Sequence, residues 1–471
     1  MFHRSFLLLI ISCFFLTASG CNRNNEPAII RPQPLPQDPF IQAYFNHNYA
    51  QGANYQDPYR EQERPGDNLE QIIIDQIATA EERIDIAIQE FRLPKIAQAL
   101  AAKKREGVKI RIILENNYRR PWSDYSQGEV YRMSERDRQR YQRGFNFIDR
   151  NGDGTLSAQE IAERDALMIL EKAGIPILDD TADGSKGSGL MHHKFVIIDQ
   201  KKLIATSANF TLSGIHGDLD NPNTQGNANN LLTLASEPLA KIFWEEFNLM
   251  WGDGVGQKPD SQFGLQKPQR DPEVVDIGNS QVTVQFSPLS KTQPWEESSN
   301  GFISEHLQQA TDSVKLALFV FSDQKIANTI ARIYQQGATV QGLIDSGFAY
   351  RYYSEGLDML GVRLARNCKV EKNNNPWQPG ISEMGIPTLP EGDKLHHKFA
   401  VIDQKMVITG SHNWSASANH QNDEFVLAIE NPTVAAHYER EFQQLYSGAK
   451  LGVPAWLDEK IQTQKQTCPS L

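Results

Sequence analysis

Cysteine, long apolar runs and surplus positive charge are all scarce in this chain of 471 residues. The four cysteines include Cys13 and Cys21 near the N-terminus, which leaves only Cys368 and Cys468 in the body of the chain. The apolar stretch at residues 6–16 is too short to span a bilayer as a mature helix. The formal net charge of −11 argues against a protein whose main role is to bind polyanionic DNA, although a basic cleft can lie on an acidic body.

The N-terminus has the features of a targeting segment over residues 1–21. A short basic region precedes the apolar stretch, and small residues at 18–20 precede Cys21. This pattern resembles a bacterial lipoprotein signal, which implies cleavage before Cys21 and acylation of that cysteine. A plain secretory signal or an uncleaved anchor is the alternative. We therefore expect an exported, membrane-anchored lipoprotein at the periplasmic face or in the cell envelope, with residues 22–40 as a tether. That compartment permits a disulfide between Cys368 and Cys468, and the sequence leaves open whether it forms.

The most informative feature is a motif that occurs twice. Residues 191–199 read MHHKFVIID, and residues 395–403 read LHHKFAVID. Each copy holds a His, a Lys two residues later and an Asp five residues after the Lys, and each is followed by a turn that contains an Asn. Phosphodiester chemistry uses such a set, because one imidazole attacks phosphorus, another protonates the leaving oxygen, and cations and amides bind the charged oxygens. Asp199 and Asp403 complete the motifs, and we expect them to anchor the strand ends rather than to react.

The duplication extends beyond these motifs. Residues 41–251 and 282–448 each begin with an expected strand and continue through alternating helices and apolar strands. Each half closes with an aromatic-rich helix, whose aromatic residues are expected to pack in the core. This alternation predicts an α/β sandwich in each half. Residues 252–281 are expected to form a linker, and residues 449–471 a C-terminal tail.

Two His-x-Lys-x4-Asp motifs, each trailed by a Ser-x-Asn turn, resemble the phospholipase D superfamily. The resemblance covers about residues 41–448 and implies two duplicated α/β halves that share one active-site cleft, so that a monomer forms an intramolecular pseudo-dimer. It implies that the first His of each pair is catalytic, so that His192 and His396 face each other across the scissile phosphate. Cations and amide donors would offset the transition-state charge, so no cofactor is expected for catalysis. The further residues implied at the phosphate are Lys194, Lys398, Asn209 and Asn413, with Ser207 and Ser411 as additional substrate-binding donors.

The resemblance also implies a two-step mechanism. His192 attacks phosphorus while His396 protonates the leaving alcohol, and His396 then activates a water molecule that releases the phosphohistidine. Members of the family often carry a Glu that hydrogen-bonds a catalytic imidazole, and Glu424 fits this position. The matching residue in the first half is Asn229, so only one imidazole would have a carboxylate behind it. Which imidazole this is depends on how the two halves meet.

The first half contains an insertion, at about residues 134–170, that the second half lacks. Residues 149–160 fit the twelve-residue EF-hand loop, with Gly154 at the sharp turn. A helix is expected before the loop, over 134–143, and another after it, over 158–170. We therefore expect Ca²⁺ to order a lid or wall near the cleft; a turn that binds no ion is the alternative. The expected ligands are Asp149, Asn151, Asp153, the carbonyl of Thr155, and Glu160.

The sequence favours a phospholipase D-like phosphodiesterase that acts on phospholipids at a membrane. The lipoprotein-type signal and the acidic composition support this interpretation. An exported endonuclease of the same superfamily, acting on nucleic acid, is the main alternative, and a catalytically dead calcium-binding protein is a third. Four tryptophans are compatible with lipid contact, although core packing is the stronger interpretation for any one of them: Trp122, Trp295, Trp377 and Trp414.

Overall fold

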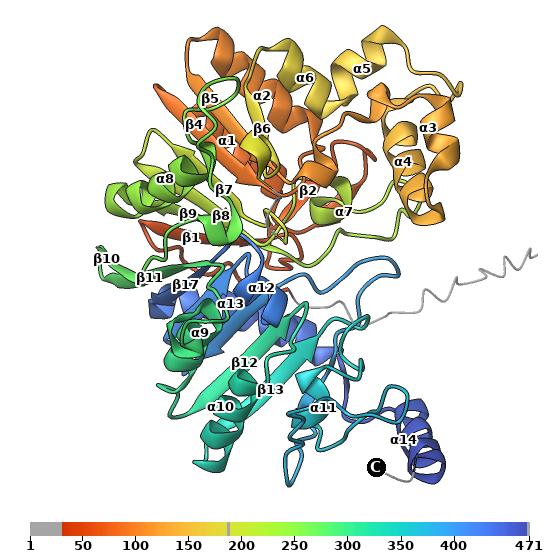
Figure 1. Ribbon diagram of the computed structural model, residues 1–471, viewed down its shortest axis with the longest axis vertical. Helices are drawn as coiled ribbons and strands as arrows, with labels where there is room; N and C mark the ends of the chain where they lie inside the picture. The colour runs from red at the N-terminus through yellow and green to blue at the C-terminus, as the bar shows by residue number, and fades with distance from the viewer. Residues whose placement is uncertain (1–30, 186–188, 469–471) are drawn as a thin grey trace, which may run out of the picture.

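The computed structural model describes residues 31–185 and 189–468 and consists of two α/β halves stacked along the long axis of the molecule (Figure 1). The first half is built on a seven-stranded sheet in the order β1-β9-β8-β7-β4-β5-β6. Its strands are β1 (Ile41–Phe45), β4 (Arg83–Ile88), β5 (Lys109–Leu114), β6 (Ile177–Asp179), β7 (Lys194–Ile198), β8 (Lys202–Thr206) and β9 (Asn230–Ala235).

The second half contains a nine-stranded sheet in the order β10-β11-β17-β16-β15-β12-β13-β14-β18. Seven of these strands, from β11 to β14 in that order, repeat the order of the first sheet, so the predicted duplication is confirmed at the level of topology. The strands are β10 (Glu273–Ile277), β11 (Ser280–Ser287), β12 (Ser313–Leu318), β13 (Thr339–Ile344), β14 (Met384–Ile386), β15 (Lys398–Ile402), β16 (Met406–Gly410), β17 (Glu424–Glu430) and β18 (Lys450–Leu451).

Apolar helices cover both faces of each sheet. The outer face of the first sheet packs on α1, α2 and α6, and the corresponding face of the second packs on α9 and α10. The inner helices α8 and α13 contact strands of both sheets. The bounds of these helices are α1 (Leu69–Ala78), α2 (Pro94–Arg105), α6 (Ala166–Lys172), α8 (Glu237–Trp251), α9 (Ser299–Leu307), α10 (Gln324–Gln335) and α13 (Pro432–Ser447).

One hydrophobic core continues from half to half. Phe195 and Phe243 of the first half pack against Phe425 of the second, with ring centroids 6.3 and 5.3 Å from that of Phe425. The aromatic residues of α8 and α13 pack in this core as predicted, although Trp244 and Tyr446 are only partly buried. Because apolar burial contributes about 25 cal/mol per Å², a shared core of this kind holds the two sheets in one fixed arrangement.

The insertion of the first half forms a separate lobe (Figure 1). It contains α4 (Glu135–Ile148) and α5 (Ala158–Arg164), and α3 (Gln127–Arg132) comes just before it in the chain. The sequence predicted one helix over 158–170, and this is wrong in detail, because α5 ends before Asp165 and α6 begins after it. The Asp165 carboxylate accepts hydrogen bonds from the backbone N–H and the hydroxyl of Ser123, which fixes the chain in a non-helical conformation at this residue.

The linker and the tail are more ordered than predicted. Residues 273–277 form β10, which pairs with β11, so the second half begins within the expected linker. The tail contributes β18 and α14 (Ala455–Thr467), and a disulfide joins Cys468 to Cys368, whose Cα atoms are 5.3 Å apart. The signal segment, Cys21 and residues 22–30 lie outside the described residues. The described end of the predicted tether instead packs on the fold, since Arg31 and Gln33 bond to Tyr49 and Arg440.

No helix in the described ranges is both long and apolar enough to cross a bilayer.

Candidate active site

The two motifs meet where the halves touch. Lys194 and Lys398 open β7 and β15, and these strands pair with the last residues of β4 and β12, Ile88 and Leu318. Each motif also bonds to the other half, because the His192 N–H donates to the Asp423 carbonyl at 2.9 Å and the His396 N–H donates to the Ala228 carbonyl at 3.0 Å. Both halves are therefore needed to form the site.

His192 has a carboxylate behind it. Its Nδ1 lies 2.6 Å from Oε2 of Glu424, and both side chains are buried. Burial, with the charges of Lys194 and Lys398, holds the pKa of His192 well below its usual range, and burial raises the pKa of Glu424. The substrate-free site therefore favours a neutral imidazole whose Nδ1–H donates to Glu424, which leaves the Nε2 lone pair free. The structure answers the open question of which histidine Glu424 supports.

His396 has an amide behind it instead. Its Nδ1 lies 2.9 Å from Oδ1 of Asn229, which comes from the first half. Burial and the charges of Lys398 and Lys194 also keep the pKa of His396 well below its usual range. The two imidazoles thus have similar surroundings but differ in one feature. Nδ1 of His192 faces a carboxylate, whereas Nδ1 of His396 faces a neutral amide.

The second histidine of each pair points into the core. Nε2 of His193 lies 3.2 Å from Glu246 of α8, and Nε2 of His397 lies 2.9 Å from Glu441 of α13. All four side chains are buried. This supports the prediction that the first histidine of each pair serves the chemistry. The two glutamates were missed in the sequence, although they occur at matching places in the two aromatic-rich helices.

The two lysines are held beside the imidazoles. Lys194 Nζ donates to the carbonyl of His192 at 2.9 Å, and Lys398 Nζ donates to the carbonyl of His396 at 2.6 Å. Burial lowers the pKa of Lys194 to about 7 and that of Lys398 well below its usual value. An anionic phosphodiester bound here would restore the charged form of both lysines, because an opposite charge at close range favours ionisation.

The asparagine amides and serine hydroxyls predicted to contact substrate differ in the hydrogen bonds that they form within the protein. Nδ2 of Asn209 donates to Gln89, whose Oε1 also lies 3.4 Å from Lys194 Nζ. The side-chain oxygens of Asn209 and Asn413 are buried without a hydrogen-bond partner among the described residues, so part of each amide is unused within the protein. The hydroxyl of Ser207 instead donates to Oδ1 of Asn229 at 2.8 Å. Ser207 therefore positions the residue behind His396, which corrects its predicted role as a direct substrate donor.

The equivalent serine in the second half, Ser411, accepts a backbone hydrogen bond. Ser411 is buried, and its hydroxyl oxygen accepts the backbone N–H of Phe425 at 3.1 Å. Ser411 thus fixes the strand that carries Glu424. This bond uses the hydroxyl oxygen only as an acceptor, so the predicted role of Ser411 as a donor to substrate stays a prediction.

Asp199 and Asp403 act as strand anchors. The Asp199 carboxylate accepts the backbone N–H groups of Glu81, Glu82 and Arg83, and Asp403 accepts those of residues 311–313, all at 2.7 to 2.9 Å. Burial alone raises the pKa of each carboxyl, but these backbone donors outweigh it and the net pKa is lowered. Both residues stand at the far end of the motif strands, so they complete the motif without touching the reacting groups.

Two further acids position the motifs from the strand ends. Glu115 follows β5 and accepts the N–H of Met191 at 2.7 Å, and Asp345 follows β13 and accepts the N–H of Leu395 at 3.0 Å. Each accepting carboxylate therefore fixes the residue immediately before a catalytic histidine. Both acids directly follow a strand at matching positions of the two halves, and their role depends on the pairing of distant strands.

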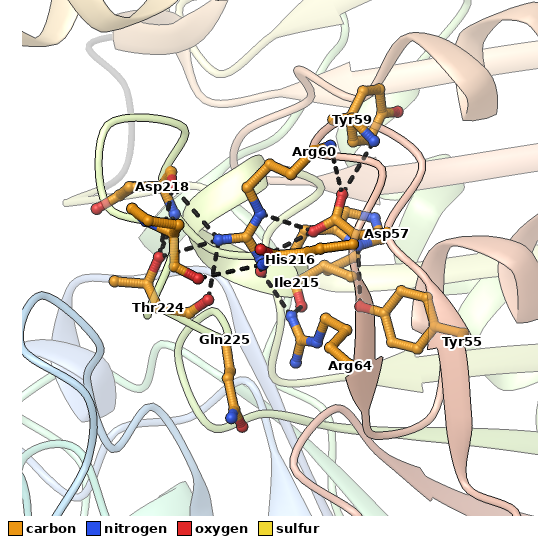
Figure 2. Close-up of polar contacts among 12 residues, drawn as sticks. Tyr55, Asp57, Tyr59, Arg60, Arg64, Ile215, His216, Asp218, Thr224 and Gln225 are labelled. Atoms are coloured by element: carbon orange, nitrogen blue, oxygen red, sulfur yellow. Dashed lines mark hydrogen bonds and ion pairs between the residues drawn. The ribbon is translucent and has the colours of Figure 1, made fainter.

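A buried polar network holds the loop that leads to Asn229 (Figure 2). The short β2 (Asn54–Gln56) and β3 (Glu63–Pro65) form a hairpin, and Arg60 and Arg64 from this region both donate to the carbonyl of His216. The His216 ring is held from both sides, since Nδ1 lies 3.0 Å from the Tyr55 hydroxyl and Nε2 lies 2.9 Å from Glu70. His216 directly follows α7 (Leu212–Ile215), so these bonds fix the start of the loop that leads to Asn229.

The same loop reaches the second half before it ends at Asn229. Arg60 Nη1 donates to the Thr224 carbonyl at 2.9 Å, as Figure 2 shows. The N–H of Gln225 then donates to Asp393 at 2.7 Å, and Oδ1 of Asn227 accepts the N–H of Lys394 at 2.9 Å. The network therefore ties the first half to the segment that precedes His396.

A cavity of about 370 Å³ lies beside this segment. It is lined by Trp122 and by Arg140 and Arg143 from α4, with Asn227 and Lys394 on the other side. Of the four candidate tryptophans, Trp122 lines this cavity, whereas Trp377 and Trp414 are buried in the second half and Trp295 is partly buried against the same core. The insertion thus contributes one wall of a hollow next to the active site.

The predicted calcium loop lies between α4 and α5. The Asp149 carboxylate accepts the N–H groups of Gly152 and Gly154, Asp153 accepts that of Thr155, and Glu160 accepts those of Arg150 and Asn151. Within the described ranges, no group of three or more His, Cys, Asp or Glu side chains is arranged to hold a metal ion. The oxygen donors of the loop are of the type that calcium takes, but Glu160 is turned toward backbone N–H groups.

A duplicated α/β fold with one His–Lys pair from each half at a shared seam defines the two-histidine class of phosphodiester-cleaving proteins. The chain matches the family described as "Cardiolipin synthase, PLD-like domain" over residues 73–251 and 303–446. Because these ranges make up more than half of the sequence, the protein belongs to this PLD-like family.

Curated relatives match a shorter stretch. The chain is 27% identical over 153 residues to "Mitochondrial cardiolipin hydrolase" of Mus musculus, covering 32% of this chain and 60% of that protein. It is 26% identical over 137 residues to "Phospholipase D" of Rickettsia typhi, covering 29% of this chain and 57% of that protein. The chain thus spans just over half the length of these curated relatives.

A solved structure has the same overall fold. The phosphatidylserine synthase of Haemophilus influenzae Rd KW20 superposes with a TM-score of 0.51 at 12% identity, over 94% of this chain and 97% of that one. At this identity the likeness concerns the arrangement of both halves and not the substrate.

Proposed function

We propose that the protein is a phospholipase D-like phosphodiesterase that hydrolyses phospholipids through a phosphohistidine intermediate. The observation that carries this proposal is the asymmetric pair at the seam, in which His192 is backed by Glu424 and His396 by Asn229, with a buried lysine beside each. Two imidazoles that must play different roles at one pH need different surroundings. The structure supplies that difference within one site.

The chemistry follows from the donors and acceptors on each ring. Nε2 of His192 attacks phosphorus, and the carboxylate of Glu424 stabilises the positive charge that develops on the ring. The negative charge of the bound phosphodiester favours protonation of His396, and its protonated Nε2 gives this proton to the leaving oxygen as the phosphorus–oxygen bond breaks. His396, now neutral, takes a proton from water, whose oxygen attacks the phosphohistidine and frees His192. Lys194 and Lys398 stabilise the extra negative charge on the phosphoryl oxygens throughout.

Phospholipid is the substrate class that the surroundings favour. The relatives named above carry lipid-related names. The chain has a net negative charge, and its N-terminal sequence resembles a lipoprotein signal. We further propose export, acylation of Cys21 and action as a monomer whose two halves form the pseudo-dimer. Nucleic acid is the alternative substrate, because its backbone offers the same phosphodiester group.

Parallel assays decide between these substrates. The purified chain is incubated with mixed phospholipid vesicles and, separately, with plasmid and single-stranded DNA, with His192→Ala/His396→Ala as the control. We expect headgroup release that the control lacks, and no cleavage of DNA. A nuclease instead would cut DNA with activity that falls steeply as salt rises, because phosphate contacts release counterions. DNA cleavage without headgroup release contradicts the lipid proposal, and an absence of both products favours a binding protein.

We also propose that the loop at 149–160 binds Ca²⁺ once Glu160 turns away from Arg150 and Asn151. The oxygen donors of Asp149, Asn151 and Asp153 support this, together with the helix on each side. Adding millimolar calcium is expected to raise the Tm by a few degrees relative to chelator, because an ion that binds only the folded state stabilises it. Glu160→Gln should remove the difference, and Glu163→Gln on the same helix is the matched control. An equal Tm in calcium and chelator for the unmodified chain would show that the loop is only a turn.

A further inference from the structure

The second half contains a hollow near the end of its sheet at which His396 lies. Asp345 directly follows β13 and accepts the N–H of Leu395, and the chain then turns through Ser346 and Gly347 into the wall of a cavity of about 360 Å³. Phe348 of this turn packs on Phe319, whose ring lies 4.9 Å from the ring of His396. Two packed phenylalanine rings therefore connect the wall of the hollow to the catalytic histidine of the second half.

Positive charge and aromatic rings line this hollow. Its charged lining residues are Arg351, Arg366 and Lys460, and no acidic side chain lines it. Among the described residues none of these three cations forms an ion pair: Arg351 donates to the Gly347 carbonyl, and Arg366 lies over the Tyr352 ring at 5.6 Å. In a chain with a net charge of −11, this is a local excess of uncompensated positive charge aimed at a cavity.

Exposed apolar residues stand beside these cations. Trp456 lines the hollow and is 51% exposed, and Leu451 and Val453 just before it are 43% and 37% exposed. A soluble surface gains nothing from a cluster of exposed large apolar groups, so such a cluster indicates a binding surface. Tryptophan with neighbouring lysine or arginine is the composition that suits a membrane interface, because the ring enters the headgroup layer while the cations meet phosphates.

The surface is rigidly held. Leu457 and Ile461 of α14 pack against Leu357 and Leu364, with Leu357 in α11 (Glu355–Met359). The Cys368–Cys468 disulfide and two hydrogen bonds between Gln464 and Ala365 fasten the far end of the helix. Both α11 and α14 lie on the same side of the molecule as α4 and α7 (Figure 1). A flat partner that met α14 would therefore lie on the same side of the molecule as α4 of the insertion.

We propose that this cationic aromatic surface, formed by Arg351, Arg366, Leu451, Val453, Trp456 and Lys460, docks the protein on an anionic phospholipid bilayer. A lipid phosphate enters the hollow between the three cations, and the apolar side chains insert at the headgroup layer. The inference rests on the proposed function, because it assumes a lipid substrate. It adds that the protein takes this substrate from the anionic bilayer on which it docks. A bilayer fits better than a nucleic acid, because exposed aliphatic groups contribute to insertion but have no partner on a sugar–phosphate chain.

Co-sedimentation with vesicles tests this directly. The chain from residue 31 onward is used, since the contacts described above lie within 31–468, and it is mixed with vesicles of phosphatidylcholine alone or with phosphatidylglycerol. Arg351→Gln/Arg366→Gln/Lys460→Gln should lower binding to the anionic vesicles by about 100-fold at low salt, because each cation near an anionic surface contributes about 1 kcal/mol. Trp456→Ser should lower it further. The control removes three exposed lysines elsewhere, as Lys172→Gln/Lys258→Gln/Lys291→Gln, and should bind like the unmodified chain.

A water-soluble phosphodiester separates docking from chemistry. All these variants should hydrolyse bis(p-nitrophenyl) phosphate at the unmodified rate, while headgroup release from anionic vesicles falls with binding. Equal vesicle binding by the unmodified chain and the triple variant would overturn the docking surface, even if headgroup release persists. Binding of single-stranded DNA that depends on the same residues, without vesicle binding, would reassign the surface to nucleic acid. Vesicle binding that depends on these residues without any headgroup release would leave docking supported and contradict the proposed function instead.

Discussion

His192→Ala is expected to lower turnover by about four orders of magnitude or more, because removal of a nucleophile closes the covalent route. His396→Ala should differ in kind. His192 and Glu424 remain intact in that variant, so a substrate whose leaving group needs no proton still transfers its phosphoryl group to His192. Water attack is then slow because its general base is missing. The phosphoenzyme should therefore accumulate in His396→Ala and be absent in His192→Ala.

Mass spectrometry of the denatured protein after a brief reaction with bis(p-nitrophenyl) phosphate measures this, with peptide mapping to locate the label. Asn229→Ala is a useful control, since it leaves His396 present but removes the acceptor at its Nδ1. It should slow both steps modestly without trapping a stable intermediate. A label on His396 in the His192→Ala variant would reverse the two roles.

Most of the site could be predicted from the sequence because its parts are local. A His, a Lys and an Asp at fixed spacing on one strand keep their relation whatever the rest of the chain does, and duplication makes the motif stand out. The strands β5 and β13 were also visible, since an apolar, β-branched run shortly after a Gly leaves few alternatives. The anchoring role expected for Asp199 and Asp403 is confirmed for the same reason, because each caps the strand end nearest to it.

The features that sequence analysis missed depend on distant pairings. That Glu424 would meet His192, and not His396, follows from the bridge between Met191 and Asp423 across the seam, which no local pattern encodes. The disulfide needed residues 100 positions apart to be brought together by α14. Ser207 was expected to face substrate, but the expectation ignored the competing acceptor on Asn229, which is fixed by the fold of the loop after His216.

Replacing Glu424 with glutamine is the sharpest test of the asymmetry and is expected to lower kcat by about 10²- to 10⁴-fold. Glutamine has nearly the same shape and can keep the hydrogen bond from Asn422, so the buried site should stay folded. It has no negative charge, however, and cannot stabilise the cationic ring that forms as His192 bonds to phosphorus. The first step should therefore slow while KM for a soluble phosphodiester changes little.

The pH profile distinguishes this electrostatic role from a purely structural one. A carboxylate beside an imidazole favours the protonated ring, so its removal lowers the pKa of His192. Because the nucleophile must be neutral, the acid limb of kcat/KM should move to lower pH in Glu424→Gln, whereas a role in folding alone would leave the limb in place. Asn229→Asp is the matched variant, since it adds a carboxylate behind His396. It should raise the pKa of the general acid and move the alkaline limb to higher pH, with much smaller loss of rate. If Glu424→Gln kept its rate and its profile, the carboxylate would have no part in the chemistry, and the difference between the two halves would have to be sought elsewhere.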